Sequence, residues 1–294
     1  MRNYKIITDS TCDLPASVIH ELDLHVIPME YIIDGICHLH DIEDQEEKTR
    51  AFYDGLRAGS VSTTSMINTA RFSEVFSSYL EEGTDILYIS FSSALSGTYN
   101  AARIAAEEMR EAYPERTIST VDSRAASIGQ GLLVYHAGVL KGQGMPLEEL
   151  TPWLEEKKDN LCHWFTVEDL HHLKRGGRIS ALSANVGTAL SIKPILHVDL
   201  EGKLLTQGKV MGRKKSLSEL VSRMKSHSFT PEEQTVIIGH ADSVDDALFL
   251  EKKVRQELKV KDVIVTYIGP VIGSHTGPGM IGLVFLGQKD ILNQ

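Results

Sequence analysis

The sequence predicts an α/β protein of two domains, and three observations carry this prediction. The chain has 294 residues, which is long enough for two ordinary domains, each with its own hydrophobic core. In the first half, short apolar runs alternate with helical segments, a pattern typical of a mainly parallel sheet covered by helices on both faces. In the second half, hairpin signals mix with helices, which indicates an α+β domain with a mixed or antiparallel sheet. A polar run near residue 155 places the boundary, giving an N-terminal α/β/α domain over 1–155 and a C-terminal α+β domain over 156–294.

The first half is expected to open with a strand over Tyr4–Thr8 and a helix over Leu14–Leu22, with Asp13 as the N-cap and Pro15 in the first turn. The further elements expected before the boundary are a β segment at His25–Ile33, helices near Asp44–Arg57 and at Asn68–Glu81, a strand at Asp85–Ser90, a helix at Gly97–Ala112, a strand at Thr117–Val121 and a helix at Arg124–Lys141. The last helix is rich in Ala and Gly. Its small side chains either leave room for a ligand or let the helix pack closely on a sheet.

The second half is expected to contain a hairpin whose turn is Leu200-Glu201-Gly202. The elements expected around it are a strand at Cys162–Thr166, helices at Val167–Leu173 and Ser180–Ala189, strands at Lys193–Asp199 and Lys203–Val210, a helix from Arg213 to about Ser226, a strand at Gln234–His240, a helix at Ser243–Leu258, and strands at Asp262–Ile268 and Ile281–Leu286.

Composition narrows the classes of function. The formal net charge is −10, whereas a nucleic-acid-binding protein of this size usually carries a basic surface, so we expect no nucleic-acid partner. The three cysteines lie far apart without a C-x-x-C pair, as in a reducing compartment. The N-terminus shows no basic-then-apolar signal segment, and no apolar run approaches the roughly 18 residues that span a bilayer. We therefore expect a cytoplasmic protein.

Four clusters of small polar residues each lie where a strand is expected to end, at 8–13, 62–65, 92–98 and 122–123. Ligands of doubly wound sheets bind beyond the carboxyl ends of the strands, so these clusters are expected to converge on one crevice. Hydroxyls and backbone N–H groups donate hydrogen bonds without a full positive charge, which suits a carboxylate. The P-loop and dinucleotide fingerprints are absent. The alternative is local: each cluster only caps a helix or closes a turn.

The second half contributes charged candidates and one histidine in an unusual loop. Basic residues gather at 174–178 and at 212–215, either as an anion or partner site or as solvated surface charge. Gly273–Gly279 holds His275 among three glycines and a proline, which indicates a tightly shaped loop around that histidine. No His, Asp, Glu and Cys spacing indicates a metal site, so we expect no metal and no cofactor.

Two functions other than carboxylate binding at the strand ends remain open at this point. Ser96 with His275 forms a candidate acyl hydrolase pair, although the segment lacks the G-x-S-x-G nucleophile motif. The second alternative is a protein that binds a smaller polar anion. This alternative predicts a short, hydrated pocket, whereas a ligand with a long apolar part would need a deep apolar pocket.

The ordered set of motifs resembles the DegV family of bacterial fatty-acid-binding proteins over essentially the whole chain. The motifs that carry the resemblance are Thr8-Asp9-Ser10-Thr11-Cys12-Asp13-Leu14, Thr63-Thr64-Ser65, Leu95-Ser96-Gly97-Thr98-Tyr99, Asp122-Ser123, Lys174-Arg175-Gly176-Gly177-Arg178-Ile179 and His275-Thr276-Gly277-Pro278-Gly279. One position departs from the family pattern: Met66-Ile67 stands where the family usually has Gln-Pro.

The resemblance implies a lipid-binding protein without catalytic residues of its own. A long-chain fatty acid would lie between the domains, with its carboxylate held by the hydroxyls of Thr64 and Ser96. Ser65, Gly97 and His275 would complete the ligand site. The protein would present the acid to a separate ATP-dependent fatty acid kinase subunit, which makes an acyl phosphate for phospholipid synthesis.

The resemblance also implies a surface for the partner. Arg175, Arg178 and Arg213 would lie near the head-group mouth and the face that docks the kinase. A transient contact with a membrane surface is left open.

Overall fold

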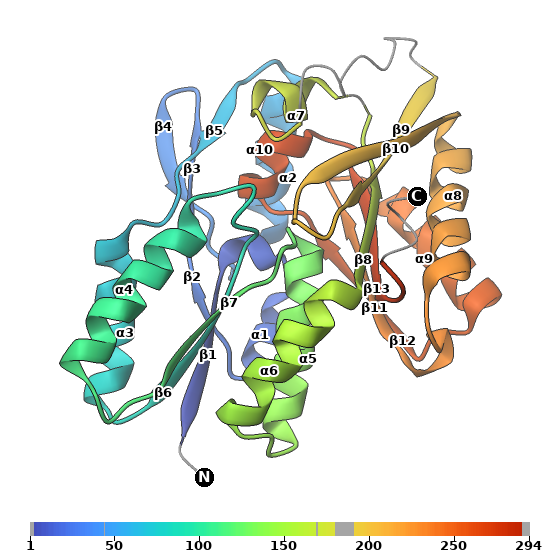
Figure 1. The fold of residues 1–294 in the computed structure, drawn as a ribbon. Helices are drawn as coiled ribbons and strands as arrows, with labels where there is room; N and C mark the ends of the chain where they lie inside the picture. The colour runs from blue at the N-terminus through green and yellow to red at the C-terminus, as the bar shows by residue number, and fades with distance from the viewer. Residues whose placement is uncertain (1–2, 44, 169, 180–190, 290–294) are drawn as a thin grey trace.

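The computed structural model describes residues 3–43, 45–168, 170–179 and 191–289, and it has the α/β fold that the sequence predicts (Figure 1). The described strands form a four-stranded, a six-stranded and a three-stranded sheet. The helix expected at Ser180–Ala189 lies outside the described residues. No helix in the described ranges has the length and apolar character that a bilayer crossing requires.

The four-stranded sheet is entirely parallel, as predicted, in the order β2-β1-β6-β7. Its strands are β1 (Tyr4–Asp9), β2 (His25–Ile27), β6 (Asp85–Ser90) and β7 (Ile118–Asp122). Every residue of β6 is buried, which suits a central parallel strand covered on both faces. Helices α3 (Thr69–Glu81) and α4 (Thr98–Ala112) pack together on one face.

The six-stranded sheet is mixed, in the order β10-β9-β8-β13-β11-β12, with only β11 and β12 parallel. Its strands are β8 (Leu161–Thr166), β9 (Ile192–Val198), β10 (Leu204–Met211), β11 (Thr235–His240), β12 (Asp262–Tyr267) and β13 (Ile281–Leu286). The predicted hairpin is present between β9 and β10, with Gly202 at φ +80° in its turn. Helices α8 (Arg213–His227) and α9 (Val244–Leu258) cover the outer face.

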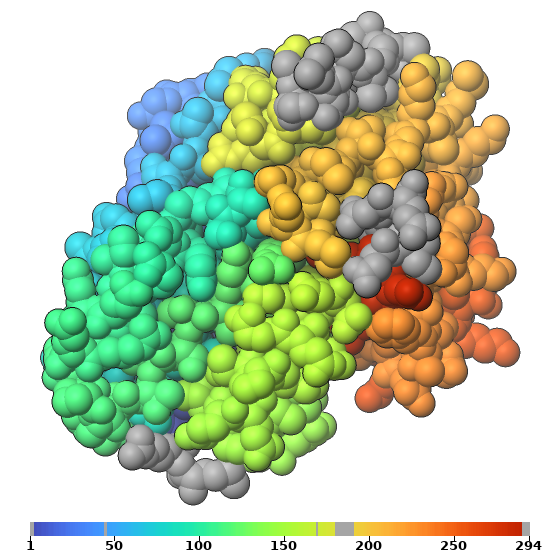
Figure 2. Space-filling view, in the orientation of Figure 1, coloured from blue at the N-terminus to red at the C-terminus, as the bar shows by residue number. Residues whose placement is uncertain are grey.

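Helix α5 (Ile128–Gly142) lies between these two sheets and contacts strands of both. It begins four residues later than predicted, because Arg124 and Ser127 adopt positive φ angles of 47° and 55° that a helix cannot contain. Its glycines serve close packing: a Cβ on Gly131 would lie 2.4 Å from the carbonyl oxygen of Cys12. One hydrophobic core therefore joins residues of both halves, and Figure 2 shows the halves packed side by side.

The three-stranded antiparallel sheet consists of β4 (Ile36–Leu39), β3 (Glu30–Ile33) and β5 (Ser62–Thr64), in that order. The β segment expected at His25–Ile33 is divided at Pro28, so that β2 and β3 join different sheets. Helix α10 (Pro270–Thr276) packs against β5, β3, α2 (Gln45–Arg57) and α7 (His171–Arg175). The loop predicted around His275 is thus in part a helix, which Pro270 opens at its first position.

The remaining elements belong to the described residues outside these three sheets and their main helices. They are α1 (Ala16–Glu21), α6 (Leu147–Lys157) and the short 3₁₀ helices η1 (Ser10–Cys12), η2 (Lys158–Asn160) and η3 (Pro231–Glu233). The predicted N-cap at Asp13 is wrong. Pro15 precedes α1, and Asp13 takes a left-handed conformation whose carboxylate turns to the other half of the chain.

Candidate functional site

A cavity of about 280 Å³ lies where the carboxyl ends of the parallel strands meet α10 and β8. This volume is near the lower end of the roughly 300–1,000 Å³ that is usual for small-molecule sites. Most of the wall is apolar, with side chains from both halves of the chain. The larger of these are Met29, Phe91, Phe165, Leu173, Leu204 and Ile272. A cavity at this edge of the sheet is what the convergence of strand ends predicts.

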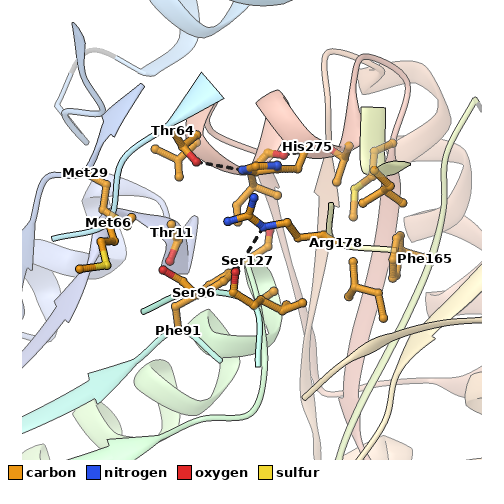
Figure 3. A pocket seen from close by; sticks show the side chains of 18 of the residues that line it. Thr11, Met29, Thr64, Met66, Phe91, Ser96, Ser127, Phe165, Arg178 and His275 are labelled. Carbon is orange, nitrogen blue, oxygen red and sulfur yellow. Dashed lines mark hydrogen bonds between the residues drawn. The ribbon is translucent and has the colours of Figure 1, made fainter. Parts of the chain in front are cut away.

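The cavity has a partly exposed polar end and a buried apolar interior. At the polar end Met66 is 54% exposed, whereas Phe165 in the interior is only 2% exposed. Figure 3 shows Met66 and Phe165 on opposite sides of the cavity, with the polar residues Thr64, Ser96 and His275 between or beside them. A ligand with one polar and one apolar end matches this division.

Six of the eight residues that the sequence and the family resemblance indicate line this cavity: Thr64, Ser65, Ser96, Gly97, Arg178 and His275. Arg175 does not line it; this side chain is exposed on α7 and contacts His172 Nδ1 at 3.0 Å. Arg213 lies outside it as well. Its guanidinium donates to Asp246 at 2.8 Å and to the Gly279 carbonyl at 2.6 Å.

Thr64 and His275 form a pair across the two halves of the chain. Thr64 ends β5, and its Oγ1 lies 2.9 Å from His275 Nε2 at the end of α10. Burial, then the charges of Arg178 and Arg175, lower the pKa of His275 to about 4, so the imidazole is neutral at pH 7. Its Nδ1 has no hydrogen-bond partner among the described residues.

Gly176 leaves the space that the imidazole ring of His275 occupies. A Cβ at this position would lie 2.3 Å from His275 Nδ1, so any side chain would displace the ring. The backbone of Gly176 is right-handed helical, with φ −72°, which every residue adopts readily. The glycine is therefore required for space and not for its backbone conformation.

Ser96 and Gly97 form the turn that precedes α4. Ser96 Oγ lies 2.9 Å from Thr98 Oγ1 and accepts the Thr98 N–H at 3.3 Å, so it acts as a local cap. Gly97 lies at the N-cap position, and α4 starts at the cavity wall. The first N–H groups of α4 and its dipole favour an anion at this end.

Met66, at the position that departs from the family pattern, packs against this turn. A Cβ on Gly97 would lie 2.7 Å from Met66 Sδ, so the glycine lets the thioether approach the start of α4. The polar end of the cavity is thus partly covered by an apolar side chain.

Arg178 is the one described lining residue that carries a charge at pH 7. Its Nε donates to the Leu95 carbonyl at 3.2 Å and its Nη1 to the Gly176 carbonyl at 2.6 Å. These bonds link it to the Ser96 turn and to the glycine beside His275. Burial lowers the pKa of Arg178, but a guanidinium stays protonated at neutral pH. The cavity therefore has a positive electrostatic bias that favours an anion.

The other polar clusters act locally or join the two halves. Asp9 accepts hydrogen bonds from Tyr88 at 2.9 Å and Gln130 at 3.2 Å, and it is fully buried. Asp13 accepts from the Ser127 hydroxyl and, at 2.9 Å, from the Gly269 N–H at the start of α10. Burial raises the pKa of Asp13 to about 7. This cluster positions the helix that carries His275.

The hydrolase alternative gains no support from the geometry. Ser96 Oγ pairs with Thr98 and His275 Nε2 pairs with Thr64. A hydrolytic base is normally oriented by an acid on its second nitrogen, and His275 Nδ1 has no such partner within the described residues. Within those residues there is also no group of three or more His, Cys, Asp or Glu side chains that could bind a metal ion.

Sequence reasoning missed four lining residues with polar side-chain atoms: Thr11, Ser127, His163 and Thr276. Thr276 directly follows His275 in the glycine-rich segment. Thr11 belongs to the first polar cluster, and its position after β1 was the available signal. Ser127 lies just before α5 in a stretch that was assigned to the helix. His163 is a single histidine inside an apolar strand, a pattern that normally indicates a core position.

Comparison with known proteins agrees with this architecture. The model of a family described as "Uncharacterised protein, DegV family" matches residues 3–288. A DegV domain-containing protein of Clostridium perfringens is 47% identical over 288 residues, which cover 98% of this chain and 99% of that protein.

Two solved structures extend the comparison. A DegV family protein of Thermus thermophilus, described as binding fatty acid, has a TM-score of 0.87 and 31% identity, and the match covers 98% of this chain and 100% of that one. DegV of Bacillus subtilis, described as a fatty acid binding protein, has a TM-score of 0.81 and 27% identity over 98% of this chain and 100% of that one. The chain belongs to the DegV family.

Proposed function

We propose that this protein binds a long-chain fatty acid in the cavity, with the carboxylate at the Thr64 and Ser96 end and the tail in the apolar interior. The observation that carries the proposal is the division of one cavity into a positively biased polar end and a buried apolar wall. A small polar anion would leave the apolar part without a function. The solved relatives described as fatty acid binding, at 27–31% identity over 98% of this chain, support the same assignment.

In this proposal the head group is held mainly by neutral donors. With its proton on Nε2, His275 donates to Thr64 Oγ1, and the Thr64 hydroxyl is then oriented to donate to the carboxylate. The Ser96 hydroxyl donates from the turn before α4, and Ser65 and Gly97 complete the surroundings. The Arg178 guanidinium supplies long-range attraction. Each hydrogen bond to the carboxylate contributes about 1.5–3 kcal/mol, because the acceptor is charged.

The tail supplies most of the gross binding free energy. Burial contributes about 0.8 kcal/mol for each methylene, so a chain of about sixteen methylenes gives roughly 13 kcal/mol before ordering costs. The contacts to the head group therefore determine how the fatty acid is oriented in the cavity and why a carboxylate is preferred, while burial of the tail determines most of the affinity.

The protein then acts as a carrier that presents the acid to a separate ATP-dependent kinase subunit. A partly exposed polar end is consistent with this role, since the carboxylate would stay within reach of a partner that phosphorylates it. Arg175, which is exposed on α7, is placed to meet an acidic surface of that partner. We retain Arg213 as a second docking residue, although its bonds to Asp246 and Gly279 leave it less free.

Native mass spectrometry of the purified protein tests the ligand assignment. We expect one long-chain fatty acid for each chain, or uptake of one after delipidation and incubation with octadecanoic acid. Protein that stays empty in the presence of the acid contradicts the assignment.

A coupled assay with the kinase subunit and ATP tests presentation. Acyl phosphate should form only when the loaded protein is present, and Arg175→Ala should slow its formation without weakening acid binding. Equal phosphorylation of free acid in the absence of this protein rejects the carrier role.

A further inference from the structure

The inner wall of the cavity carries a polar side chain that the proposed function does not use. His163 lies in the middle of β8, is 3% exposed and lines the cavity. Neither of its ring nitrogens has a hydrogen-bond partner among the described residues. A buried polar group without a partner costs about 1–3 kcal/mol, and the large majority of such groups are bonded. The ring is therefore in a position that an occupant of the cavity can satisfy.

The surroundings of His163 leave one nitrogen for such an occupant. The Nδ1 edge packs against α5, where a Cβ on Gly129 would lie 2.7 Å from Nδ1 and 3.4 Å from Cε1. Nε2 lies further from that glycine. Burial, together with the charge of Lys289 and the neighbouring His197, lowers the pKa of His163 to about 3. The neutral ring has one N–H donor and one acceptor nitrogen. Because a hydroxyl can both donate and accept, it can bond to Nε2 whether or not that nitrogen carries the proton.

His163 belongs to the tail region of the cavity and not to the head group. Strand β8 runs from Leu161 to Thr166, and the chain then continues to α7 and Arg178 at the polar end. Phe165, two residues nearer to that end on the same face of the strand, already lies in the buried interior at 2% exposure. No hydrogen bond joins His163 to the Thr64 and His275 pair within the described residues.

We infer that the cavity selects a long-chain acid that carries a hydroxyl group on its tail, and that His163 Nε2 recognises this hydroxyl. The inference rests on the proposed function, since the carboxylate at Thr64 sets how far along the chain the hydroxyl lies. An unsubstituted tail leaves His163 without a partner in an apolar surrounding. A hydroxyl on the tail carbon that lies beside His163 gives the ring nitrogen a hydrogen-bond partner and removes the free-energy cost of leaving it unpartnered. The hydroxyl in turn replaces the hydrogen bonds that it made to water.

The same sheet supplies a matched control. His197 on β9 is also buried, at 1% exposure, and both of its nitrogens are likewise unpartnered among the described residues. It stacks on Trp164, the neighbour of His163 on β8, and it does not line the cavity. A change at His197 therefore perturbs a buried histidine of the same sheet without touching the ligand.

The test is a competition experiment on delipidated protein loaded with the fluorescent probe cis-parinaric acid. The competitors are octadecanoic acid and its hydroxy derivatives, with the hydroxyl moved stepwise along the chain. We expect the wild-type protein to bind one positional isomer about 2- to 10-fold more tightly than octadecanoic acid, as one recovered hydrogen bond implies. His163→Phe and His163→Leu should both lose this preference, whereas His197→Phe should keep it.

The outcomes separate the two proposals. Equal displacement by octadecanoic acid and by every hydroxy isomer, or a preference that survives in a folded His163 variant, overturns the inference but leaves fatty acid binding intact. Two His163 variants of different size, checked by thermal unfolding, guard against a folding defect. Failure of all these acids to displace the probe rejects the proposed function itself, and the inference with it.

Discussion

Replacement of Thr64 by valine tests the head-group site most sharply, because valine keeps the shape of threonine and removes only the hydroxyl. In the proposed complex this hydroxyl accepts from His275, at 2.9 Å, and donates to the carboxylate. Loss of a hydrogen bond to a charged acceptor costs about 1.5–3 kcal/mol, which corresponds to roughly 10- to 150-fold weaker binding. Thr63→Val is the matched control, because Thr63 is the neighbour on β5, is exposed and does not line the cavity.

The assay is displacement of a fluorescent fatty acid by octadecanoic acid and, in parallel, by octadecanol. Thr64→Val should weaken binding of the acid by the factor above and change binding of the alcohol much less, since the alcohol has no charged head group. Thr63→Val should leave both unchanged. Equal losses for acid and alcohol would refute the reasoning, because they would show that Thr64 supports the cavity and does not bind the carboxylate.

Three further predictions concern the same region. Ser96→Ala should weaken acid binding by about 1–3 kcal/mol in the same displacement assay, and unchanged affinity would remove Ser96 from the site. Gly176→Ala should displace His275 and lower acid affinity, whereas Gly142→Ala, where a Cβ meets nothing within 4 Å, should not; equal affinities would contradict the packing argument. The raised pKa of Asp13, about 7, means that the folded protein holds this proton more tightly than the unfolded chain does. Protonated Asp13 therefore adds roughly 4 kcal/mol to the free energy of unfolding below about pH 4, and this contribution is lost as the pH rises to about 7. In urea unfolding, Asp13→Asn should accordingly gain stability relative to the wild-type protein between pH 5 and pH 8. A constant difference between the two proteins over that range would contradict the pH argument.

The parallel sheet could be predicted from the sequence because its strands are short apolar runs, and burial on both faces requires such runs. The run at residues 85–90 was assigned with the bounds that β6 has. Strands β4 and β5 were not predicted as strands. All four residues of β4 are exposed, so no apolar alternation marks them, and their pairing with β3 depends on long-range contacts. Helix α6 was missed because Pro152 and its charged residues hide the apolar positions Leu147, Leu150 and Leu154.

The candidate site also combines residues that a local sequence pattern marks with residues that only long-range contacts bring together. The hydroxyl clusters around Thr64 and Ser96 were visible because Ser, Thr and Gly gather at the ends of strands. Their meeting with His275 joins residues 211 positions apart in the sequence, which only the family resemblance could suggest. The N-cap prediction for Asp13 is wrong because an Asp directly before the helix expected at Leu14 resembles a local cap, whereas α1 begins only at Ala16. The partners of Asp13, Ser127 and Gly269, come from distant segments. His163 carried no local signal at all.

The most direct test of the central claim is a crystal structure of the protein loaded with octadecanoic acid. The account predicts a carboxylate within hydrogen-bond distance of both Thr64 Oγ1 and Ser96 Oγ, with the tail running past Phe165 into the buried part of the cavity. A carboxylate that points into the interior, or an acid that lies outside this cavity, would contradict it.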